Sequence, residues 1–98
     1  MYENTNNIAQ VNSSEYAKNS MNKAFLNFYL IKLHLCDDKP GINECISRIK
    51  YKGGEDEIEA LQLIVDNDMN KYKKEKAIEA IGYIRARLRT QEGESQNI

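Results

Sequence analysis

Three side chains near the middle of the chain have the chemistry of metal ligands or of a nucleophilic pair: His34, Cys36 and Cys45. Three ligands without a paired C-x-x-C are a weak zinc signal. On a helix, positions 34 and 36 point about 200° apart, so these two side chains cannot hold one ion together. A Cys–His nucleophile also needs groups that stabilise an oxyanion, and the sequence offers no such motif. We therefore expect reduced, core-filling cysteines, no metal, no cofactor and no enzymatic activity.

Two further segments match part of a ligand-binding loop motif. Residues 66–70, DNDMN, match the first, third and fifth positions of an EF-hand-like calcium loop. Lys71 stands where the sixth position needs glycine, and Ala77 stands where the twelfth needs glutamate. We interpret the segment as a turn between two helices. Gly53 and Gly54 lack the spacing of a phosphate-binding loop, and we interpret them as a helix stop.

Length and composition bound the class of protein. The chain has 98 residues, of which 41% are hydrophobic and 30% charged, and its net charge is −1. These values are typical of one small globular domain with no global attraction to nucleic acid or to an anionic membrane. The longest apolar run is shorter than the roughly 20 residues that cross a bilayer. We expect a cytoplasmic protein with a domain at 14–90, between flexible segments at 1–13 and 91–98.

The spacing of apolar residues predicts four helices. The first spans about 14–36 with Asn12 or Ser13 as N-cap, and the second opens with Pro40 in its first turn. The third starts in the acidic run 55–57, and the fourth spans about 71–89. This predicts an all-α fold, a small four-helix bundle or a pair of helical hairpins. The alternative is an α+β fold with a hairpin around 28–36 and 44–52, because part of the first segment alternates with a period of two.

The first predicted helix is apolar on two faces, which an ordinary surface helix is not. One face is a heptad-like seam, and we expect it to pack on the other helices. The second face is either core or an interface, and we take it as the candidate partner-binding surface. The seam consists of Ala17, Met21, Ala24, Phe28, Ile31 and Leu35. The candidate surface consists of Phe25, Leu26, Tyr29, Leu30 and Leu33.

Opposite charges are separated in the second half of the chain. Acidic residues dominate 54–69, and basic residues dominate 70–90. Such blocks are typical of neighbouring helices that complement each other. They also allow a basic surface for nucleic acid, formed by Lys71, Lys73, Lys74, Arg85 and Arg89. The leading hypothesis is a small regulatory, adaptor or inhibitor protein that binds another protein through a helical surface, as a homodimer. The alternative is a dimeric DNA- or RNA-binding regulator that uses the basic helix at 71–89.

Overall fold

A computed structural model describes the backbone of residues 2–96 and the side chains of residues 18–91. The described backbone contains four α-helices and no strand, so the all-α prediction is confirmed and the alternative with a hairpin around 28–36 and 44–52 is wrong. The alternating residues of the first segment belong to a helix, because the 3–4 spacing upstream continues through them. The helices are α1 (Tyr2–Leu35), α2 (Lys39–Lys52), α3 (Glu55–Asn67) and α4 (Lys71–Gln96).

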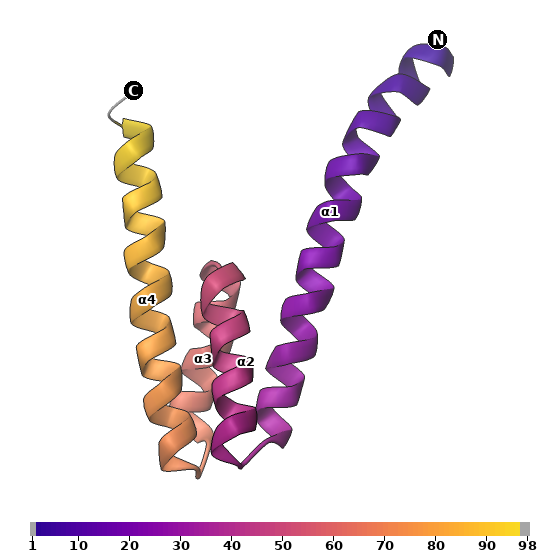
Figure 1. The fold of residues 1–98 in the computed structure, drawn as a ribbon. Coiled ribbons are helices and arrows are strands. Elements are labelled where there is room, and N and C mark those ends of the chain that lie inside the picture. Colours follow the sequence, from indigo (N-terminus) through magenta and orange to yellow (C-terminus); the bar gives the residue numbers. More distant parts are fainter. Residues whose placement is uncertain (1, 97–98) are drawn as a thin grey trace.

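The two short helices lie between two long ones, whose outer ends diverge on the same side of the molecule (Figure 1). The α1–α2 and α3–α4 turns lie together at the opposite end. The most extensive packing is between α3 and α4, followed by α1 with α2 and α2 with α4. Helix α1 touches α3 only slightly, so α2 forms most of its contact with the rest of the bundle.

Local side-chain chemistry fixes where the short helices begin. Asp38 is the N-cap of α2, and its Oδ2 accepts a hydrogen bond of 2.9 Å from the Gly41 N–H. Pro40 lies in the first turn of α2, as predicted, where its missing N–H costs nothing. Glu57 accepts a 2.7 Å hydrogen bond from the Gly54 N–H, which is the half of a capping box that a glycine N-cap allows. The acidic start of α3 is therefore confirmed.

Gly53 ends α2, but not through the left-handed conformation that C-terminal glycines usually adopt. Its φ is −73°, which any residue can adopt. A Cβ at Gly53 would lie 2.6 Å from the carbonyl oxygen of Ile49 and 2.9 Å from Cβ of Glu57. Glycine is needed here because the end of α2 and the first turn of α3 approach each other closely.

The core is built from aliphatic residues of all four helices. Its fully buried members are Leu33, Ile42, Cys45, Ile49, Leu61, Ala77, Ala80 and Ile84, with Ile46, Ile64 and Ile81 nearly so. Most of this set comes from α2, α3 and α4, in which the buried apolar residues recur at a spacing of three or four. Among the described helices, none combines the length and apolar character needed to cross a membrane.

The ends of the two long helices differ from the prediction. Helix α1 begins at Tyr2, so the predicted N-cap at Asn12 or Ser13 is wrong. Residues 1–13 contain neither proline nor glycine, and nothing in that segment stops a helix. Helix α4 continues to Gln96 beyond the predicted end near Arg89. The side chains of 1–17 and 92–98, Ala17 of the predicted seam among them, lie outside the described residues, and the flexibility of 1–13 and 91–98 stays a prediction.

Candidate protein-binding surfaces

The candidate partner-binding face of α1 packs inside the molecule. Leu26 and Leu33 are 4% and 0% exposed, and Leu33 belongs to the central core. Phe25, Tyr29 and Leu30 are half-buried. Cations of α2 lie over two of the rings: Lys52 Nζ is 4.8 Å from the centroid of Phe25, and Arg48 Cζ is 6.0 Å from that of Tyr29. This face is therefore the one that joins α1 to α2.

The seam that was expected to be core faces solvent instead. Met21 is 73% exposed, Phe28 57%, Ile31 62% and Leu35 80%, and Ala24 between them is also exposed. These five residues, which we call the α1 stripe, recur at steps of 3, 4, 3 and 4 and form one line along the helix. Single exposed apolar residues are common, but a continuous stripe is not, so the α1 stripe is the candidate partner-binding surface of this helix.

Ion pairs join α1 to α2 and α3 on either side of its buried face. Lys23 donates to Asp56 at 2.8 Å and to the buried Glu57 at 3.0 Å, which ties α1 to the start of α3. Lys32 donates to Glu44 of α2 at 2.8 Å. Both lysines flank the face that contains Leu26 and Leu33, so rotation of α1 to bury the stripe would break all three contacts. Carboxylate hydrogen bonds raise the pKa of Lys23 and of Lys32.

The predicted basic surface is only partly available. Lys73 is fully buried, and its Nζ lies 3.4 Å from Asp68 Oδ2, 3.6 Å from Asp37 Oδ1 and 3.3 Å from the carbonyl oxygen of His34. It therefore joins the α1–α2 turn to the α3–α4 turn instead of facing outward. Lys71 is exposed and Lys74 half-buried at the start of α4.

Arg87 is also occupied inside the molecule. Its Nη2 donates to the carbonyl oxygen of Lys50 at 2.8 Å and to that of Gly53, so it caps the C-terminal end of α2 from α4. Arg85 and Arg89, on the other side of α4, are exposed and form no ion pair with a described side chain. Among the side chains of 18–91, the pair Asp68–Lys73 is the one ion pair between the acidic and basic blocks of the α3–α4 hairpin, and Asp56 and Glu57 at the start of α3 pair with α1 instead.

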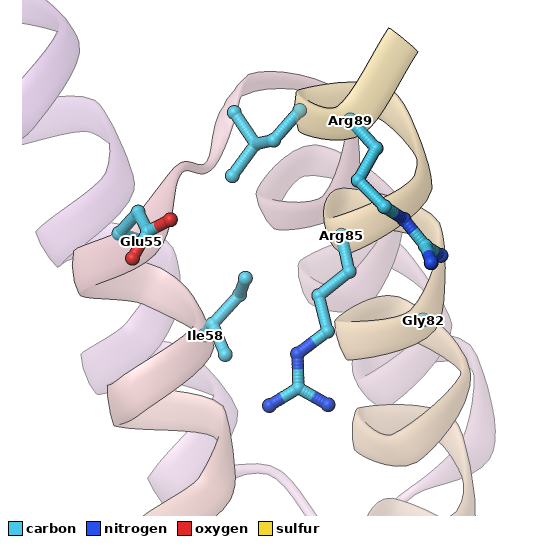
Figure 2. A pocket seen from close by; sticks show the side chains of 6 residues that line it. Glu55, Ile58, Gly82, Arg85 and Arg89 are labelled. Carbon is cyan, nitrogen blue, oxygen red and sulfur yellow. The ribbon is translucent and has the colours of Figure 1, made fainter. Parts of the chain in front are cut away.

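A shallow groove of about 640 Å³ lies between the start of α3 and the second half of α4. Figure 2 shows Glu55 and Ile58 on the α3 side and Arg85 and Arg89 on the α4 side. The groove is lined by Glu55, Ile58, Gly82, Arg85, Leu88 and Arg89. Nothing lies within 4 Å of a Cβ built on Gly82, so this glycine leaves the groove open. Chemically, two guanidinium groups beside an apolar floor suit a carboxylate on an apolar side chain or peptide.

The cysteines lie in the interior and close to each other. Cys45 is buried and Cys36 half-buried, and both are free thiols. Burial, aided by the nearby Cys36 thiol, raises the pKa of the Cys45 thiol to about 11. At neutral pH Cys45 is therefore a neutral core side chain and a poor nucleophile. Within residues 18–91, no three His, Cys, Asp or Glu side chains come close enough to hold a metal ion.

Sequence reasoning missed the surface that the structure leaves open. The α1 stripe was recognised as a seam, but periodicity alone does not say which of two apolar faces turns inward. One signal in the sequence is the position of Lys23 and Lys32, which lie on either side of the buried face and pair with carboxylates of α3 and α2. Comparison of the chain with protein-family models, characterised proteins and solved structures gave no match.

Proposed function

We propose that this protein is a small non-enzymatic binding protein, a regulator, adaptor or inhibitor, that acts by packing the α1 stripe against another protein chain. The observation that carries the proposal is the exposure of four large apolar side chains on one line of a helix whose opposite face already packs in the core. Such a surface gives affinity by removing apolar area from water, and Phe28 is the kind of aromatic residue that anchors interfaces.

The rest of the molecule supports this use of α1. The bundle holds the helix in place through Leu26, Leu33, Lys23 and Lys32, so the stripe is presented on a preformed scaffold. A preformed helix loses less conformational entropy on binding than a free peptide does. Two free thiols agree with a reducing compartment, and we place the protein in the cytoplasm.

The alternative, a nucleic-acid-binding regulator, has less support. Of the five basic residues proposed for it, Lys73 is buried in a contact between turns. Lys71 stands at the start of α4, and Arg85 lies about four turns further along the helix (14 residues at roughly 3.6 per turn). Phosphate contacts must line up along a groove or strand, and the exposed basic residues do not form one dense patch.

Affinity capture from a lysate of the source cells tests the proposed function. Three baits are used: the unaltered protein, Phe28→Glu and Asn22→Glu. Phe28→Glu places a charge in the stripe. Asn22→Glu is the control, because it places the same charge at an exposed position about 120° around the helix from Phe28. We expect proteins captured by the unaltered bait to be retained by Asn22→Glu and lost by Phe28→Glu. Capture that is the same with all three baits contradicts the proposal. Nucleic acid that is retained at low salt and released as salt rises supports the alternative.

A further inference from the structure

The α1 stripe has the register of a helix that packs on another helix. Met21, Phe28 and Leu35 are seven residues apart, with Ala24 and Ile31 between them, which matches the a and d positions of two heptads. The bundle packs on α1 through Leu26 and Leu33, which lie about 140–160° around the helix from Phe28. The stripe and the packed face therefore lie on different sides of α1, so the stripe is open to a second helix.

Side-chain sizes favour an antiparallel partner that is identical to α1. With Phe28 placed on a two-fold axis, Met21 lies opposite the partner's Leu35, and the small Ala24 lies within one residue of the level of the partner's Ile31. In the layer of Ala24 and Ile31 a small side chain then faces a large one, which lets that layer interdigitate. A parallel pair would instead stack Ala24 on the partner's Ala24 and leave a gap beside the Phe28 layer.

Charges favour the same arrangement. In the antiparallel register, the exposed Lys18 of one copy comes level with Asp37 and Asp38 at the α1–α2 turn of the other. The ammonium group then also lies near the C-terminal end of the partner's α1, where a cation is favourable. In a parallel pair the two Lys18 residues would lie at the same level, so that like charges would lie side by side.

We infer that the α1 stripe is covered by the α1 stripe of a second copy of this chain, in an antiparallel two-fold dimer centred on Phe28. The inference rests on the proposed function, because it names the occupant of the same surface. It gives an isologous interface in which every contact occurs twice. The α3–α4 groove lies away from this interface and stays open in both copies.

Sedimentation velocity over a concentration series tests the dimer. We expect the unaltered protein and Asn22→Glu to form dimers, and Phe28→Glu to stay monomeric at concentrations at least 100-fold higher. Phe28 is exposed in the single chain, so helical content and thermal unfolding of diluted Phe28→Glu should match those of the unaltered protein. A monomer at all concentrations for the unaltered protein, or dimers of equal strength for Phe28→Glu, overturns the inference.

Disulfide trapping tests the orientation. In a Cys36→Ser background, Cys45 is buried and does not interfere. A mixture of the Ala24→Cys and Ile31→Cys variants should form a disulfide between the two, whereas Ala24→Cys alone should form almost none. The reverse result, a strong homodisulfide from Ala24→Cys alone, means a parallel pair and overturns the inference.

The same variants separate failure of this inference from failure of the proposed function. If the protein is monomeric but Phe28→Glu loses a captured partner, the stripe binds a different chain, and only the dimer is wrong. If the thiol of Ile31→Cys in a monomeric protein reacts as slowly as a buried one, the stripe is covered within the chain and both are wrong.

Discussion

Lys73 lies where four segments of the chain meet: the end of α1, the α1–α2 turn, the α3–α4 turn and the start of α4. Its ammonium group has the carbonyl oxygen of His34 and the carboxylates of Asp37 and Asp68 around it. Asn70 strengthens the same junction, since its amide donates to the carbonyl oxygen of Asp37 at 3.2 Å. A buried lysine with such partners holds the two turns together.

Substitution of this lysine measures that contribution. We expect Lys73→Met to lower the free energy of unfolding by about 1–3 kcal/mol, because it leaves the Asp68 carboxylate and the His34 carbonyl without their buried partner. Lys71→Met, at an exposed position two residues away, should change it by less than about 0.5 kcal/mol. Urea unfolding of both variants gives the comparison. Equal effects would mean that Lys73 contributes no more than a surface lysine.

Gly82 and Gly53 should respond in opposite directions to substitution by alanine. Gly82→Ala adds a methyl group where nothing lies within 4 Å, inside a helix, so we expect a gain of about 0.5–1 kcal/mol. Gly53→Ala places a Cβ 2.6 Å from the Ile49 carbonyl oxygen, so we expect a loss. Thermal unfolding should show a raised midpoint for the first and a lowered one for the second. A lowered midpoint for Gly82→Ala would show that this position is packed.

At the scale of the element, α1 is a helix with two apolar faces that differ in burial. Leu33→Ala removes a fully buried side chain and should cost about 2–5 kcal/mol. Ile31→Ala, two residues away on the stripe, should cost less than about 1 kcal/mol. Both changes are measured by chemical denaturation in a Phe28→Glu background, so that self-association does not contribute. A larger cost for Ile31→Ala would mean that α1 is rotated relative to this structure.

The α3–α4 turn makes the fold sensitive to acid. The backbone N–H of Asn70 and then the Lys73 ammonium hold the pKa of Asp68 below its ordinary value of 3.8, against the effect of burial. A carboxyl group whose pKa is lower in the folded state stabilises the fold above its unfolded pKa, and this contribution is lost as the pH falls through the folded value. We expect the unfolding midpoint in urea to fall on acidification below about pH 4, and to fall less in Asp68→Asn. Asp66→Asn, at an exposed position, is the control and should follow the unaltered protein.

For the whole molecule, the sequence predicted the number, type and order of the helices, because 3–4 spacing, Pro40, Gly53 and the acidic start of α3 are local signals. It did not predict which face of α1 is buried, because α1 has two apolar faces and the periodicity is the same whichever of them packs on the bundle. The choice depends on long-range pairs such as Lys23 with Glu57. The burial of Lys73 was missed for the same reason: its partners come from two distant turns.

The candidate binding surfaces show the same difference between what local spacing predicts and what packing decides. Arg85 and Arg89 are exposed, as a basic surface requires, because they fall on the side of α4 away from the core. The candidate partner-binding residues do lie on one face of α1, but that face packs in the interior. They are Phe25, Leu26, Tyr29, Leu30 and Leu33. The spacing of residues identifies the apolar and basic faces of each helix. The packing of the helices then decides which face is exposed to a partner.

The pattern of contacts between the helices has a consequence for how the chain folds. The most extensive packing joins α3 and α4, which are linked by a short turn, whereas α1 packs chiefly on α2. Contacts between neighbours in sequence close with little loss of entropy, so the barrier to folding should be low and folding should take milliseconds or less. Because α2 also packs on α4, helices α2, α3 and α4 can come together without α1, so we expect the α3–α4 hairpin to be formed in the transition state and α1 to dock afterwards. Leu33→Ala would therefore speed unfolding with little change in the folding rate, while Leu61→Ala would slow folding.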